Sequence, residues 1–130
     1  KDKFGKSALV YCVNKDQIEA TEFLLIHQPE VDSLDKFEWT PLMWAVKKDY
    51  FEITKLLVKY KANINHKDDE GTPIIQYAVE NESIEVVKFL IEKGVDINVT
   101  DQYGLSPLVY ALKTKNKEIV ELIRSAGGEY

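Results

Sequence analysis

The sequence predicts an all-α solenoid, an array of helix–turn–helix units with projecting β-turn or hairpin fingers. The first observation is a period of 33 residues, which four sets of positions keep through four copies. The sets are Asp2, Asp35, Asp68 and Asp101; Cys12, Ala45, Ala78 and Ala111; Glu19, Glu52, Glu85 and Glu118; and Phe23, Leu56, Phe89 and Leu122. The second observation is that each period holds two short apolar segments at helical spacing. Such units bury their apolar faces on their neighbours.

Each unit begins with a tight turn. The pattern Asp-x-x-Gly, as at 68–71 and 101–104, places a glycine where the turn needs a positive φ. In the second copy Glu38 stands where this glycine is expected.

The first helix of each unit follows this turn. In Thr40-Pro41 and Ser106-Pro107, the hydroxyl residue is predicted to be the N-cap and the proline the first helical residue. In the third copy Thr72-Pro73 directly follows Gly71, one position earlier than in its sister copies. We therefore expect Thr72 to cap a helix that begins one residue early, with Pro73 as its first residue.

A second helix and a loop complete each unit. Phe51, Ile53, Leu56 and Leu57 fall at helical spacing. The recurrent glutamate, Glu52 in this copy, suits the first turn of a helix. Loops such as 63–65 lead into the next turn. The chain is thus predicted to be a single domain, 1–130, with repeats at about 2–34, 35–67, 68–100 and 101–130.

These motifs resemble those of ankyrin repeat proteins over the whole chain. The family motif T-P-L-H-x-A is matched by Thr40-Pro41-Leu42-Met43-Trp44-Ala45 and nearly matched by Ser106-Pro107-Leu108-Val109-Tyr110-Ala111. The resemblance implies a curved stack. Its first helices line the concave side, its second helices line the convex side, and the finger tips project from it.

Two family positions are occupied differently in this sequence. Apolar packing is expected to replace the motif histidine, except at Gln76; the residues there are Val10, Met43, Gln76 and Val109. The glycine between the two helices is replaced by Asp16, Asp49, Glu82 and Lys115. A positive φ at these positions would cost about 1 kcal/mol each.

Composition excludes several classes of function. A formal net charge of −5 and a pI near 5.1 argue against a nucleic-acid surface, and no apolar run approaches the roughly 18 residues of a membrane span. His27 and His66 are isolated, and no metal-ligand set or phosphate-binding glycine loop occurs. The sequence therefore predicts a protein that is not an enzyme and has no cofactor.

Cys12 is the only cysteine, so the chain has no internal disulfide. This favours a cytoplasmic location, while the start at Lys1 leaves removal of a signal peptide open. Because Cys12 shares the register of three alanines, we expect it to be buried and inert.

Two rows of aromatic residues are candidates for a binding surface. The row on the first helices, which includes Tyr11, either fills space between helices, the favoured interpretation, or forms an exposed stripe. The row in the turns has no evident core to enter and is predicted to contact a partner. The partner-binding candidates from both rows and from the first-helix ends are Phe4, Phe37, Trp39, Trp44, Lys47, Lys48, Tyr77, Tyr103, Leu105 and Tyr110.

The resemblance implies a protein–protein interaction module, which binds a partner through its concave face and finger tips. We expect a monomer that binds an acidic, partly apolar protein. One alternative is a targeting arm of a larger enzyme or effector, whose activity lies outside this chain. Another is a structural spacer in a longer solenoid, which an apolar outer face on the first repeat would favour. At the other end, Lys117 replaces the apolar Ile18, Phe51 and Ile84, as in a capping repeat.

Overall fold

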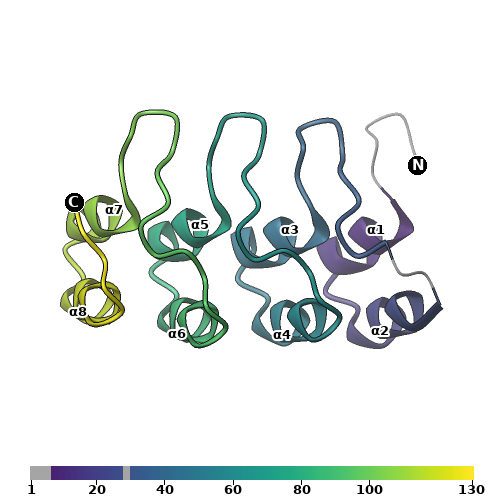
Figure 1. Ribbon diagram of the computed structural model, residues 1–130. Coiled ribbons are helices and arrows are strands. Elements are labelled where there is room, and N and C mark those ends of the chain that lie inside the picture. The colour runs from purple at the N-terminus through teal and green to yellow at the C-terminus, as the bar shows by residue number, and fades with distance from the viewer. Residues whose placement is uncertain (1–6, 28–29) are drawn as a thin grey trace.

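Two rows of short helices make up the protein. The computed structural model describes residues 7–27 and 30–130, which form eight helices and, apart from an isolated bridge between Lys67 and Pro73, no strand. The helices are α1 (Ala8–Asn14), α2 (Ile18–His27), α3 (Pro41–Lys47), α4 (Phe51–Lys59), α5 (Ile74–Glu80), α6 (Ile84–Glu92), α7 (Pro107–Thr114) and α8 (Lys117–Ser125). Figure 1 shows α1, α3, α5 and α7 side by side above α2, α4, α6 and α8, which confirms the predicted all-α solenoid.

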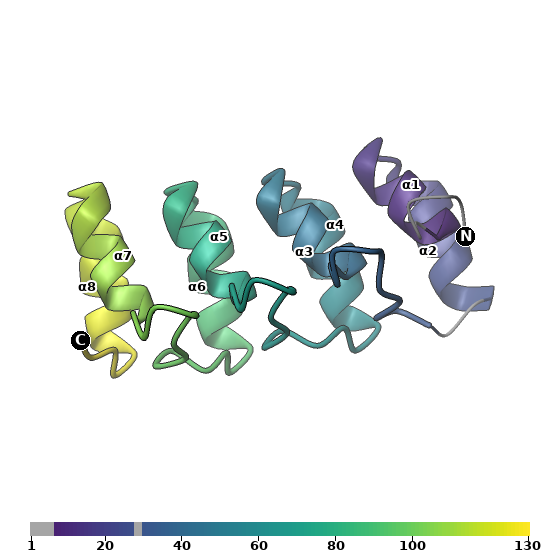
Figure 2. The same cartoon turned by 90° about the horizontal axis from the view of Figure 1, so that it is seen from above.

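Each helix pair packs on the pairs beside it. First helices contact first helices, and second helices contact second helices, along the whole array. Seen from above, the four pairs form one line, and the loops between them project to the same side (Figure 2). The side chains that are buried most completely come from both rows; among them are Leu42, Met43, Ile53, Leu57, Ile74, Ile75, Leu90, Leu108, Ile119 and Ile123. Stability therefore comes from contacts between neighbouring repeats.

Hydroxyl caps begin two of the first helices. The Ser7 hydroxyl accepts a hydrogen bond from the Val10 N–H at 3.3 Å, and the Thr40 hydroxyl accepts one from the Met43 N–H at 3.2 Å. Ser106 also occupies the N-cap position, but its hydroxyl donates to the Glu129 carbonyl and makes no cap bond. The predicted cap is therefore confirmed at Thr40, and Ser106 holds the end of the chain instead.

The prediction that Thr72 caps α5 is wrong. The helix begins at Ile74, in the same register as the other first helices, and Pro73 occupies the N-cap position without a side-chain bond. Thr72 belongs to the preceding turn, where its N–H donates to the Asp68 carboxylate at 3.0 Å and its carbonyl accepts from the Asp68 N–H. The packing of α5 against α3 and α7 keeps the period and overrides the local Thr-Pro signal.

Residues other than glycine adopt left-handed backbone conformations between the paired helices. The φ angles are 54° at Asp16, 61° at Asp49, 55° at Glu82 and 62° at Lys115. These are the positions where the sequence lacks the expected glycine, so the predicted strained turn is confirmed in every repeat. Glu38 replaces the turn glycine in the same way, with a φ of 58°.

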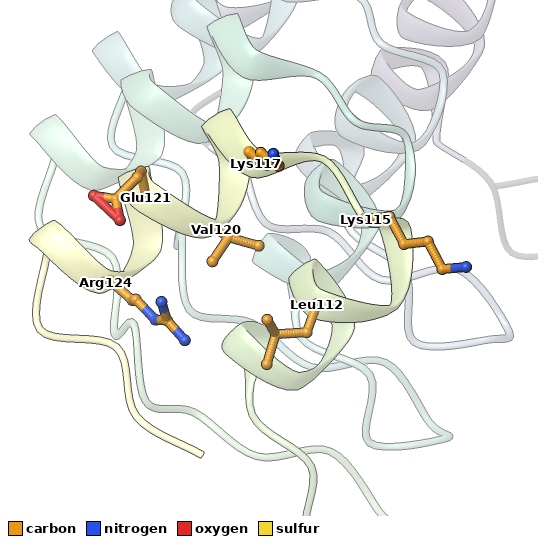
Figure 3. A pocket seen from close by; sticks show the side chains of 6 residues that line it. All are labelled: Leu112, Lys115, Lys117, Val120, Glu121 and Arg124. Carbon is orange, nitrogen blue, oxygen red and sulfur yellow. The ribbon is translucent and has the colours of Figure 1, made fainter.

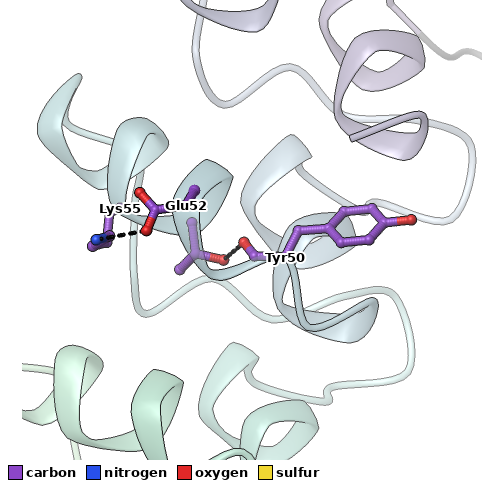
Figure 4. Close-up of polar contacts among 4 residues, drawn as sticks. Tyr50, Glu52 and Lys55 are labelled. Carbon is purple, nitrogen blue, oxygen red and sulfur yellow. Dashed lines mark hydrogen bonds and ion pairs between the residues drawn. The ribbon is translucent and has the colours of Figure 1, made fainter. Parts of the chain in front are cut away.

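The second helices begin with a glutamate in the first turn, as predicted. In α4 this residue, Glu52, pairs with Lys55 at 3.0 Å, and the Thr54 hydroxyl donates to the Tyr50 carbonyl at 2.8 Å (Figure 4). An exposed ion pair contributes about 0.2–1 kcal/mol. Burial of Ile53 and other apolar residues therefore contributes more to the position of α4.

A ladder of polar side chains joins each loop to the next. The side-chain oxygens of Asp32, Asn65 and Asn98 accept hydrogen bonds from the N–H groups of Asn63, Asp96 and Glu129 respectively, at 3.0, 2.8 and 2.8 Å. Each bond crosses from one repeat to its follower. The ladder therefore fixes the spacing of the loops, and with them the spacing of the fingers.

The first repeat differs from the others in its exposure. Cys12 is half-buried, whereas Ala45, Ala78 and Ala111 in the same register are fully buried. This register faces the preceding helix pair, and no described helix packs on that side of α1. The expectation of a buried cysteine was therefore wrong, because it assumed a neighbour that the described residues do not supply.

Candidate functional site

The fingers share a common frame built on one aspartate each. We define the fingers as residues 35–39, 68–72 and 101–105. In each finger the aspartate Oδ1 accepts hydrogen bonds from the N–H groups two and four residues later, at 2.9–3.0 Å. The aspartate N–H also donates to the carbonyl four residues later. The turn is therefore closed entirely by backbone groups and one carboxylate oxygen.

The other carboxylate oxygen ties each finger to a first helix. Asp35 Oδ2 accepts a hydrogen bond from the Trp44 indole N–H at 3.0 Å, and Asp68 Oδ2 accepts one from the Tyr77 hydroxyl at 2.6 Å. Asp101 accepts in the same way from the Tyr110 hydroxyl. All three aspartates are buried. Three of the predicted aromatic candidates are therefore half-buried anchors of the fingers, as the packing interpretation of this row favoured.

These contacts shift the pKa values of Tyr77, Tyr110 and Asp101. Burial, followed by the hydrogen bond to Asp101, raises the pKa of Tyr110 to about 12, and burial with the bond to Asp68 raises the pKa of Tyr77. Burial alone would raise the pKa of Asp101, but hydrogen bonds from Tyr110 and from backbone N–H groups outweigh it and lower this pKa. Each tyrosine is therefore a neutral donor and Asp101 a charged acceptor at neutral pH.

The finger tips carry the exposed side chains. Phe37 is 47% exposed and Tyr103 is 73% exposed, and the Lys36 ammonium lies 5.1 Å from the centre of the Phe37 ring. The tip between them carries Asp69 and Glu70, both exposed. Phe4, the candidate of the first copy, lies outside the described residues. The row of tips is thus aromatic, acidic and aromatic in the second, third and fourth repeats.

Trp39 does not project from its finger as expected. Its ring centre lies 4.7 Å from that of Trp44 and 5.1 Å from that of Tyr77, so it links the second and third repeats. Trp39 is half-buried against the core, and Leu105 at the matching position of the fourth repeat is also half-buried. An apolar residue at the last position of a finger is partly buried because a neighbouring first helix lies beneath it.

The ends of the first helices alternate in charge along the array. Lys47 and Lys48 are exposed in the second repeat, and the Lys47 ammonium lies 5.2 Å from the centre of the Tyr77 ring. The third repeat exposes Glu80 at the equivalent end. The fourth exposes Lys113, whose ammonium lies 5.0 Å from the centre of the Tyr110 ring. The surface therefore offers cations that the aromatic rings hold in place.

The part of the chain that the structure describes holds no group of side chains arranged for metal binding. Among residues 7–27 and 30–130, no three His, Cys, Asp or Glu side chains are grouped to hold a metal ion. A shallow hollow on α7 and α8 is lined by Leu112, Lys115, Lys117, Val120, Glu121 and Arg124 (Figure 3). Its lining combines two apolar side chains with four charged ones. We find no group there with the environment of a nucleophile or a general base.

Comparison with known families gives the same result as the fold. A family model of ankyrin repeats, three copies long, matches residues 1–68 and again residues 61–130. The chain belongs to the ankyrin repeat family. Ankyrin repeats are generally protein–protein interaction modules, and the family is typically non-enzymatic. A comparison with curated proteins gave no match. Within the described part of this ankyrin repeat protein, no helix has the length and apolar character needed to cross a membrane.

The buried aspartates are the residues whose role sequence reasoning missed. The sequence identified them as turn residues, but not as acceptors for the aromatic side chains nine positions later. The constant separation of Asp35 from Trp44, Asp68 from Tyr77 and Asp101 from Tyr110 was visible. It could have indicated a donor–acceptor pair, because Trp and Tyr usually find a hydrogen-bond partner when buried.

Proposed function

We propose that this ankyrin repeat domain binds a protein partner through its finger tips and the concave face of its first helices. The observation that carries the proposal is the exposure of Phe37 and Tyr103 on fingers whose backbone is held by a buried aspartate. An exposed aromatic ring on a rigid turn loses little conformational freedom on binding, and it supplies a large apolar area.

The charged side chains near the fingers favour a partner that carries both acidic and apolar groups. Lys47 and Lys48 would attract acidic groups, as the sequence suggested, and the exposed rings would accept apolar side chains. Asp69 and Glu70 lie between the two aromatic tips and would repel an acidic group placed there. We therefore propose a partly apolar partner whose acidic groups face the second repeat.

The double variant Phe37→Ala/Tyr103→Ala tests this proposal. Copurification from native lysate with wild type and variant, compared by quantitative mass spectrometry, identifies partners that depend on the tips. Calorimetric titration of the purified partner should then show a loss of roughly thirtyfold or more, as for other aromatic anchors at interfaces. The thermal midpoint should stay unchanged, because both side chains are exposed.

One control variant and one charge-reversal variant complete the experiment. Tyr130→Ala removes an exposed aromatic ring that is not part of a finger and should leave affinity unchanged. Lys47→Glu/Lys48→Glu should weaken binding, and more strongly at low salt than at high salt. Wild-type affinity in the tip double variant would refute the role of the tips.

A further inference from the structure

The outer face of α1 and α2 is apolar and uncovered by any described helix. Phe23 is 62% exposed and Ile26 is 59% exposed. Cys12, Ala20 and Leu24 are half-buried on the same helix pair. No other repeat exposes its apolar side chains in this way, as far as the described residues show.

Three of these positions, Cys12, Ala20 and Leu24, align with buried residues in every other repeat, whereas the register of Ile26 is exposed throughout. Ala20 aligns with Ile53, Val86 and Ile119, all fully buried, and Leu24 aligns with Leu57, Leu90 and Ile123, also fully buried. Phe23 aligns with Phe89, whose ring lies 5.9 Å from that of Phe51 in the preceding repeat, in an edge-to-face arrangement. These registers therefore form the interface with the preceding helix pair, and the first repeat carries the same interface unfilled.

The opposite end of the array is built differently. The residues that face the next repeat are apolar at Ile84 and Ile91 of α6, but Lys117 and Arg124 occupy these positions on α8. Both of these residues are exposed. A polar outer face is what a terminal repeat needs for solubility. The outer face of α8 is therefore charged at positions where α6 is apolar, whereas the first repeat keeps the apolar pattern of an internal one.

We propose that the outer face of α1 and α2 docks the helix pair of another ankyrin repeat, whose exposed side is apolar like that of α6. In this arrangement the residue equivalent to Ile84 covers Phe23, as Phe51 covers Phe89, and the first helix of the added pair covers Cys12. The proposal continues an interface that the array already contains three times, and it concerns a face separate from the finger tips. A second copy of this chain stacked head to tail would instead bring Lys117 and Arg124 against Phe23 and bury two unpaired charges.

An added repeat tests the proposal with the full chain retained. A copy of residues 68–99 placed directly before Lys1 continues the 33-residue period. The matched control carries the same copy with Ile84→Lys and Ile91→Arg, the residues found on α8. Cys12 is the only cysteine in both proteins, so its rate of reaction with a thiol reagent reports cover of this face.

We expect the apolar copy to slow the labelling of Cys12 about tenfold, since the new apolar contact must open before the reagent reaches Sγ. The Lys/Arg control should leave the rate close to that of the unmodified chain. Phe23→Glu should restore fast labelling in the presence of the apolar copy. Circular dichroism should show additional helix with the apolar copy. Packing on the apolar face of α1 and α2 stabilises the helices of the added repeat.

Three results would overturn the proposal. The first is equal labelling of Cys12 with both copies, and the second is an apolar copy that stays unfolded. The third is self-association of the unmodified chain that protects Cys12 and disappears in Phe23→Glu, measured by sedimentation equilibrium. That third result would make another copy of this chain the occupant. None of these results depends on the finger tips, so the proposed partner binding is tested separately.

Discussion

Asp101 shows how much one side chain contributes to a finger. Its carboxylate accepts hydrogen bonds from two backbone N–H groups and from the Tyr110 hydroxyl, and it is buried. Removing the hydroxyl leaves a charged oxygen without its partner. We expect Tyr110→Phe to lower the free energy of unfolding by about 1–3 kcal/mol, the usual cost of losing a bond to a charged acceptor. Urea unfolding at neutral pH measures this loss.

The same variant should change the response to acid. Because the pKa of Asp101 is lowered in the folded state, its contribution is full above its unfolded pKa, about 3.9. That contribution is lost as the pH falls through the lower folded value. Wild type should therefore lose more stability than Tyr110→Phe between about pH 5 and pH 3. Parallel acid dependences in the two proteins would contradict this assignment.

The left-handed residues between helices store a small strain. Lys115 has a φ of 62° and is exposed, so Lys115→Gly removes steric strain without removing a buried contact. We expect a gain of about 1 kcal/mol in the free energy of unfolding. Lys88→Gly, in the middle of α6, is the control and should cost about 1 kcal/mol. A loss of stability in both variants would show that the turn is not strained.

Residues that act through local geometry were predictable, and residues that act through their neighbours were not. The positive φ at Asp49 follows from the missing glycine alone. The burial of Trp39 depends on Trp44 and on Tyr77 of the next repeat, which no local pattern reveals. The prediction of a buried Cys12 was wrong for the same reason. Its burial requires a neighbour on the side of α1 that faces away from α3.

At the scale of helices, caps and packing compete to set where a helix begins. Thr40 caps α3, whereas Thr72 lies in the finger before α5 and uses its backbone there. We expect Thr40→Ala to cost about 1 kcal/mol and Thr72→Ala clearly less, because alanine keeps the backbone bonds of Thr72. Denaturant unfolding of the two variants decides the matter. Equal losses would restore a capping role for Thr72.

The existence and order of the helices could be read from the sequence, since the apolar period and the cap residues agree in most repeats. The third repeat is the informative exception. Its Thr-Pro pair suggested an early start, but α5 begins at Ile74, where the packing of Ile75 and Ala78 requires it. Tertiary contacts decide when a local signal conflicts with the period.

At the scale of the whole molecule, stability should vary along the array. α3 and α5 contact first helices on both sides, whereas α1 contacts one first helix, α3, within the described structure. The buried residues of α2 are Thr21 and Leu25. We expect amide hydrogen exchange to be slowest in α3 and α5 and fastest in α1 and α2. Exchange measured by mass spectrometry on peptides from each repeat checks this. Uniform protection would instead indicate one cooperative unit.

The three buried aspartates also separate the fold from whatever the fingers recognise. Their oxygens accept hydrogen bonds from backbone N–H groups and from an aromatic donor in the helix, and these bonds require no particular side chain at the tip. The tips accordingly differ completely, with Lys36-Phe37, Asp69-Glu70 and Gln102-Tyr103 on the same frame. Substitutions at the tips should therefore cost little stability. A chain of this kind can change its specificity one finger at a time, which makes these positions natural sites for a randomised library.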